Sequence, residues 1–142
     1  LMRKFHDSIA EEHPEVVVWG TGSPMREFLH VDDLADACLF LMEHYSDDLH
    51  INVGTGIDLS IKQLAETIRS VVNPDAELVW DSSKPDGTPR KLLDVTRLRS
   101  LGWAPSIELA DGLASTYQWY LDQIGSHAGL RGIDQSAVPS TP

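Results

Sequence analysis

The fold is decided by residues 16–33, which read VVVWGTGSPMREFLHVDD. The β-branched opening predicts a strand over 16–19, because such side chains pack well on a pleated surface. The glycines and Pro24 that follow predict a turn. Residues 26–31 alternate between polar and apolar side chains and predict a second strand. The aspartate pair that ends the stretch can cap the helix that comes next.

Working outward, the rest of the chain continues this alternation of strands and helices. Ser60 stands three residues before Gln63, which is the signature of a capping box. Apolar periodicity, caps and breakers predict helices over 1–12, 34–45, 61–72 and 109–124, a short helix opened by Asp94 or Thr96, and strands over 50–54 and 77–81. The alternation predicts an α/β fold. Residues 125–142 are rich in Gly, Ser, Pro and small residues and are predicted to be a disordered tail.

The predicted helix over 34–45 carries an apolar face at spacings of three and four residues. Its members are Leu34, Cys38, Leu41, Met42 and Tyr45. Such a stripe is expected to face a core, which places the single cysteine among buried, inert positions. His30, Asp32 and Asp33 could hold a metal only if their side chains converged, and capping by the aspartates is the simpler explanation.

Composition limits the classes of function. The chain has 142 residues, 42% of them hydrophobic, which is enough for one domain with a core. A formal net charge of -11 argues against a general binder of nucleic acid or of anionic membranes. No apolar run approaches the ~20 residues of a membrane span. With one cysteine the chain forms no intrachain disulfide, which suits a reducing cytoplasm.

Neither the glycine motifs nor the tyrosines of this sequence have the pattern of a cofactor-binding or catalytic site. Gly20-Thr21-Gly22 lacks a third glycine and has Pro24 where a dinucleotide-binding helix would begin, so it is interpreted as a turn. Gly54-Thr55-Gly56 stands too far from the next helix and receives the same interpretation. No tyrosine is followed by a lysine one helical turn later, so the chain shows no catalytic acid, base or nucleophile.

Cations gather in one region of this acidic chain. Five of the eleven Lys/Arg residues, namely Lys84, Arg90, Lys91, Arg97 and Arg99, fall within sixteen positions. They could form a solvated face or bind a small anion. The 84–91 loop also carries Asp86, whose carboxylate suits the hydroxyls of a ribose. Trp19 offers a flat ring and Arg26 can bind phosphate through two hydrogen bonds, so a nucleotide site is one of the two interpretations.

The same segments carry a resemblance to a known family. Residues 16–33, 50–56, 83–98 and 112–119 closely resemble the C-terminal part of the GDP-L-fucose synthase family, within the extended short-chain dehydrogenase/reductase superfamily. The resemblance covers about residues 1–122, and it is most specific in Trp19–Arg26 and Lys84–Lys91. It implies an α/β, Rossmann-like fold of which residues 1–124 form mainly the small substrate-binding lobe, with the N-terminal Rossmann part missing.

Members of that family convert GDP-4-keto-6-deoxy-D-mannose to GDP-L-fucose by 3,5-epimerisation and NADPH-dependent 4-reduction. The resemblance therefore implies an NADP-dependent enzyme of nucleotide-sugar metabolism, cytoplasmic and homodimeric at full length. The NADP site and all catalytic residues are expected mostly upstream, so this chain alone is expected to be inactive. The implied substrate-binding residues are Trp19, Arg26, Asp86, Lys84 and Lys91. The alternatives are a related sugar-nucleotide epimerase or dehydratase and a non-catalytic nucleotide-binding module.

Overall fold

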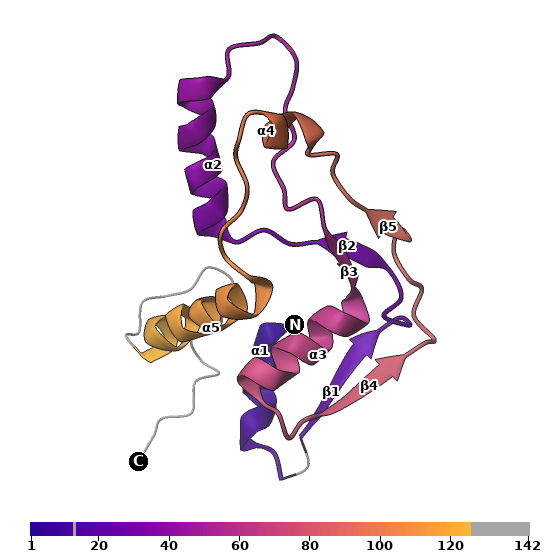
Figure 1. Ribbon diagram of the computed structural model, residues 1–142. Coiled ribbons are helices and arrows are strands. Elements are labelled where there is room, and N and C mark those ends of the chain that lie inside the picture. The colour runs from indigo at the N-terminus through magenta and orange to yellow at the C-terminus, as the bar shows by residue number, and fades with distance from the viewer. Residues whose placement is uncertain (13, 126–142) are drawn as a thin grey trace.

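A computed structural model describes residues 1–12 and 14–125. Helices and strands alternate along the chain (Figure 1), which confirms the predicted α/β class. The elements are α1 (Met2–Asp7), η1 (Ser8–Ala10), β1 (Glu15–Trp19), β2 (Met25–Glu27), α2 (Val31–His44), β3 (Asp58–Ser60), α3 (Ile61–Val72), β4 (Glu77–Asp81), β5 (Arg90–Lys91), α4 (Thr96–Ser100) and α5 (Leu109–Gly125). Apart from Gly125, the predicted disordered tail lies outside the described residues.

The described strands form two small sheets. In the first, β1 runs parallel to β4, with Val17 opposite Val79. In the second, β2 lies in the middle, antiparallel to β3 and parallel to β5. One short turn leads from the end of β1 into β2, so the end of the first sheet lies beside the second (Figure 1).

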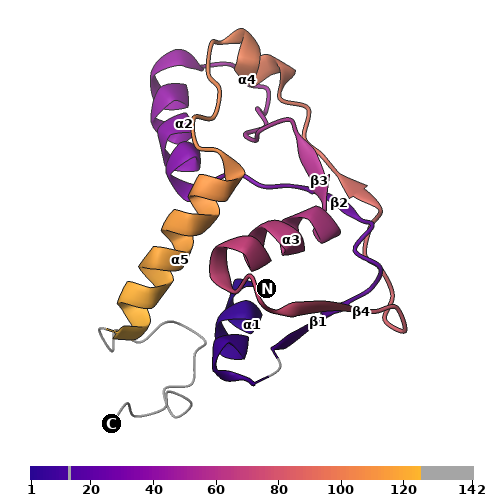
Figure 2. The ribbon, with the colours of Figure 1, turned by 60° about the horizontal axis from the view of Figure 1, so that its bottom comes forward.

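The larger core lies between the first sheet and three helices. Phe5 and Val16 are almost fully buried there, together with Leu64, Ile68, Val72 and Ala76. α3 contacts both α1 and α5, and Figure 2 shows α3 between α5 and the β1–β4 sheet. Leu113 and Tyr117 pack against this core, as the periodicity of α5 predicted. The capping box of α3 is also confirmed, because Ser60 and Gln63 each accept a hydrogen bond from the other's backbone N–H.

A second, smaller core joins α2 to α4 and to the segment before α5. It is built on Ala37, Leu98 and Trp103. The start of α2 differs from the prediction, since the side chain of His30 caps the helix and accepts a hydrogen bond from Asp32 N. Asp33 is instead buried, and its carboxylate accepts hydrogen bonds from Ser106 and from the backbone of Ile107. Burial alone would raise the pKa of Asp33, but these hydrogen bonds together lower it.

The prediction that Cys38 is buried was wrong. Cys38 is exposed, and on the same face of α2 Leu34 is 43% and Met42 is 80% exposed. α2 packs through its other side, where Ala37 and Phe40 meet the smaller core. Periodicity identified an apolar stripe correctly, but a stripe is buried only where another element covers it. Among the described residues, the smaller core covers Leu41 of this stripe but leaves the three exposed members uncovered.

The predicted strands also need correction in three places. Residues 50–54 are not a strand, because they form no ladder with another segment of the described chain. The strand expected over 26–31 covers only Met25–Glu27. The loop 82–91 contains a strand that was not predicted, since Arg90–Lys91 pair with β2. Among the described residues, no helix combines the length and apolar character that crossing a bilayer requires.

Candidate substrate-binding site

The turn between β1 and β2 is held from two sides. Gly20 and Gly22 have φ values of 86° and 75°, a region that favours glycine. Gly20 N donates to Asp81 O at the end of β4. Gly22 O and Pro24 O accept from the first two backbone N–H groups of α3, each at 2.9 Å. Gly22 also lies against the ring of Trp80, where a Cβ would overlap with it. The turn is therefore fixed to both β4 and α3.

Trp19 stands at the end of β1, just before this turn. Its side chain is 69% exposed, which is unusual for the largest apolar residue. Lys84 Nζ lies 5.8 Å from the centre of the Trp19 ring, within reach of a cation–π contact. These two residues, 65 positions apart in the sequence, thus form one surface with a flat ring and a positive charge.

Asp86 lies beside the same turn. Its Oδ1 accepts a hydrogen bond from Thr21 N at 2.8 Å, and its Oδ2 accepts one from Thr21 Oγ1 at 2.6 Å. The Thr21 hydroxyl and then the Thr21 backbone N–H lower the pKa of the Asp86 carboxyl. Asp86 therefore stays charged while it joins the 82–91 loop to the β1–β2 turn.

Arg26 and Lys91 are brought together by the second sheet. They are Cα partners on the parallel strands β2 and β5, so their side chains leave the same face of the sheet. Arg26 Nη1 donates to Met25 O at 2.6 Å. Arg26 Nη2 is 3.4 Å from the position that a Cβ would take on Gly87, so the guanidinium lies against the loop that carries Asp86. Lys91 is exposed.

The cation cluster seen in the sequence is divided by the structure. Arg90 donates two hydrogen bonds to the carboxylate of Asp58, and these bonds are the main reason why the pKa of Asp58 is lowered. Arg97 donates to His50 O, and Arg99 donates to Thr55 O at 2.7 Å. These three arginines bind acceptors in other segments of the same chain. Lys84 and Lys91, which the resemblance had singled out, are the cations on the Trp19–Arg26 side.

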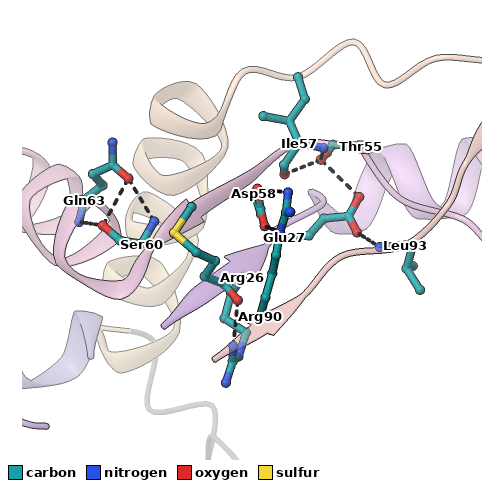
Figure 3. Close-up of polar contacts among 10 residues, drawn as sticks. Arg26, Glu27, Thr55, Ile57, Asp58, Ser60, Gln63, Arg90 and Leu93 are labelled. Carbon is teal, nitrogen blue, oxygen red and sulfur yellow. Dashed lines mark hydrogen bonds and ion pairs between the residues drawn. The ribbon is translucent and has the colours of Figure 1, made fainter. Parts of the chain in front are cut away.

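Glu27 is a residue of this region that sequence reasoning missed. It follows Arg26 on β2, and the two side chains point away from each other (Figure 3). Its carboxylate accepts hydrogen bonds from Thr55 Oγ1 at 3.2 Å and from Leu93 N at 3.0 Å (Figure 3). It also accepts one from Gly56 N. Glu27 thus ties β2 to two loops. The available signal was an acid within a predicted strand, because a carboxylate that is partly buried there needs hydrogen-bond donors.

The described residues show neither a metal site nor a dinucleotide-binding turn. No group of three His, Cys, Asp or Glu in ranges 1–12 and 14–125 is placed to hold a metal ion. Gly20–Gly22 leads into a strand, as does Gly54–Gly56, so neither turn opens a helix as the dinucleotide motif requires. Burial raises the pKa of Tyr117 and of Tyr120, which is the opposite of what an activated tyrosine needs.

Comparison with known proteins relates the sequence of this chain to a family. The NAD dependent epimerase/dehydratase family matches residues 1–54. The chain is 60% identical over 124 residues to the "Putative GDP-L-fucose synthase 2" of Arabidopsis thaliana, which covers 87% of this chain and 38% of that protein. It is 56% identical over 131 residues to the GDP-L-fucose synthase of Escherichia coli K12, in a match that covers 86% of this chain and 41% of that protein. The chain is homologous to the GDP-L-fucose synthases.

A solved structure supports the relation at the level of the fold. The structure of a GDP-L-fucose synthetase from Naegleria fowleri bound to NADP matches with a TM-score of 0.81 at 27% identity. The match covers 88% of this chain and 40% of that one. The predicted Rossmann-like, extended short-chain dehydrogenase/reductase fold is thereby confirmed. The chain spans about two fifths of the length of the GDP-L-fucose synthases it matches.

Proposed function

We propose that this chain is the sugar-nucleotide-binding part of a GDP-L-fucose synthase. The whole enzyme would convert GDP-4-keto-6-deoxy-D-mannose to GDP-L-fucose by 3,5-epimerisation and NADPH-dependent 4-reduction. The observation that carries the proposal is the grouping of Trp19, Lys84, Asp86 and Arg26 around the β1–β2 turn, in a chain 60% identical to such a protein.

Each side chain fits one part of a nucleoside diphosphate. Trp19 offers an exposed ring for stacking, and Lys84 and Arg26 offer positive charge for the phosphates. A carboxylate has about four lone-pair directions. The two hydrogen bonds from Thr21 leave Asp86 able to accept from a ribose hydroxyl as well. Lys91 shares the sheet face of Arg26 and adds to the charge on that side.

The names of the relatives favour GDP over other nucleotides. A GDP-L-colitose synthase of Yersinia pseudotuberculosis is 33% identical, and a GDP-mannoheptose C4 reductase of Campylobacter jejuni is 38% identical with a TM-score of 0.71. A UDP-glucose 4-epimerase of Thermotoga maritima is only 26% identical, with the same TM-score. Identity with the first two proteins, and with the synthases of Arabidopsis thaliana and Escherichia coli, is higher than with the UDP-sugar enzyme, which disfavours a sibling enzyme for another nucleotide. The Naegleria fowleri synthetase, at 27%, does not share this difference.

The role of this chain in catalysis would be positioning. Holding the GDP end of the substrate lets binding energy orient the sugar ring for the reaction. The reduction would need NADPH. Since the described residues lack a dinucleotide-binding turn, we expect that cofactor to bind mainly to sequence outside this chain. We further propose a cytoplasmic homodimer for the whole enzyme, and no activity for this chain alone.

Titration calorimetry with GDP, UDP and dTDP tests the proposal. GDP should bind most tightly, and Arg26→Ala should weaken binding by about 1.5–3 kcal/mol, the scale of a hydrogen bond to a charged group. Arg3→Ala is a matched control, because Arg3 pairs with Asp7 on α1, outside the proposed site. Equal affinity for the three nucleotides would argue against a GDP-sugar enzyme, and unchanged GDP affinity in Arg26→Ala would exclude Arg26 from the site.

A further inference from the structure

The contact between Thr21 and Asp86 joins two loops that lie far apart in the sequence. Thr21 N and Thr21 Oγ1 donate to different oxygens of the carboxylate, at 2.8 and 2.6 Å. Two bonds to two oxygens fix both the position and the plane of the group. The Thr21 hydroxyl has one proton, and the charged carboxylate is its strongest acceptor. Ser23 N donates back to Thr21 Oγ1 at 3.2 Å, which orients that hydroxyl.

The backbone of the turn is shaped to receive this carboxylate. Gly20 has a φ of 86°, and a Cβ there would overlap with Asp86 Oδ1. Ser23 Oγ lies 3.5 Å from Asp86 Oδ2, the oxygen that Thr21 Oγ1 also contacts. Gly20 therefore leaves room for the carboxylate of Asp86, and the Thr21 amide and the hydroxyls of Thr21 and Ser23 lie beside it. A positive φ alone explains the glycine, but the turn itself does not require an amide and two hydroxyls beside the same carboxylate.

The contact lies between the two places where the 82–91 loop reaches the proposed site. Two residues before Asp86, Lys84 faces the ring of Trp19 at 5.8 Å. One residue after it, Gly87 lies against the guanidinium of Arg26. Asp86 is thus the anchor that keeps this exposed loop beside both residues.

We propose that Thr21 is a positioning residue, which holds Asp86 so that the 84–87 segment is preorganised around Trp19 and Arg26. This rests on the proposed function, because the ligand that benefits is the nucleoside diphosphate. A loop that is already ordered costs less conformational entropy when the ligand binds. The hydroxyl of Thr21 therefore supports affinity without contacting the nucleotide.

Three variants separate the hydroxyl from the rest of the residue. Thr21→Val keeps the β-branched shape and the backbone N–H, Thr21→Ser keeps the hydroxyl, and Thr88→Val removes an exposed hydroxyl from the same loop as a control. Calorimetry with GDP measures the site, and carbon-13 NMR titration of the Asp86 carboxyl measures the contact itself. The protein used is the 142-residue chain.

We expect Thr21→Val to weaken GDP binding roughly three- to tenfold and to raise the pKa of Asp86 toward its ordinary value. Thr21→Ser and Thr88→Val should match the parent chain in both measurements. A raised pKa with unchanged GDP affinity overturns the positioning role and leaves the nucleotide site standing. Equal weakening in Thr21→Ser and Thr21→Val also overturns it. A parent chain that fails to bind GDP overturns the proposed function, and the positioning role with it.

Discussion

Glu27→Gln tests whether the carboxylate of Glu27 holds the second sheet together. One oxygen accepts from Thr55 Oγ1 and Gly56 N, and the other accepts from Leu93 N. A glutamine amide can keep only one of these oxygens, and its NH2 must then face a backbone donor. At least one hydrogen bond to a charged group is lost, so the free energy of unfolding should fall by about 1.5–3 kcal/mol.

Urea denaturation followed by far-ultraviolet circular dichroism measures this change. Glu66→Gln is the matched control, because Glu66 makes a half-exposed i,i+3 ion pair with Arg69 on α3, and such pairs contribute little. The midpoint should shift to lower urea in Glu27→Gln and stay near that of the parent in the control. Equal midpoints for the two variants would refute the reasoning, because Glu27 would then contribute no more than a surface acid.

Three further changes should affect stability. Gly22→Ala places a Cβ at φ 75° and 2.5 Å from the ring of Trp80, so it should cost about 1–2 kcal/mol for the backbone alone, measured by thermal unfolding, and an unshifted Tm would contradict it. Ser60→Ala removes the N-cap of α3 and should cost about 1 kcal/mol, with Ser70→Ala inside the same helix as control. The lowered pKa of Asp33 stabilises the fold above its ordinary pKa near 4, and this contribution is lost as the pH falls through the lowered value. The drop in Tm below about pH 4 should therefore be smaller in Asp33→Asn than in the parent.

Local signals predicted the elements that are stabilised locally. The capping box at Ser60 and Gln63 located the start of α3, and the β-branched run at Val16–Val18 located β1. The residues that specify α3 also make the first hydrogen bonds of that helix. The valines that specify β1 lie in the sheet that β1 itself forms. The same holds for α5, whose apolar spacing identified Leu113 and Tyr117 as core residues.

The errors arose where a segment depends on a partner elsewhere. Residues 50–54 have the pattern of a strand, but a strand exists only when another segment pairs with it. Cys38 lies on the part of the apolar stripe of α2 that the described chain leaves uncovered. Composition of the loop 82–91 gave no sign that its last two residues pair with β2. Pairing and coverage are tertiary properties, which periodicity does not encode.

The sequence allowed us to predict which residues form the candidate site, but not which contacts hold them in place. Trp19, Arg26, Lys84, Asp86 and Lys91 were selected by chemistry and by resemblance, and their use as a binding site stays a prediction. The contacts of Asp86 with Thr21 and of Glu27 with Gly56 could not be foreseen, because each joins residues far apart in the chain. Counting charges also overstated the free cations, since Arg90, Arg97 and Arg99 bind acceptors within the fold.

The pairing of β1 with β4 and of β2 with β5 has a consequence for biosynthesis. β1 pairs with a strand that comes about 60 residues later, and β2 needs β5 in addition to the nearer β3. Neither sheet is therefore complete while only the first half of the chain has emerged from the ribosome. Until Asp81 has been made, the valines of β1 and the turn after them lack the strand that pairs with them, and they are exposed to unwanted association. A pause in translation ahead of this point should therefore lower the yield of folded protein more than a pause after it.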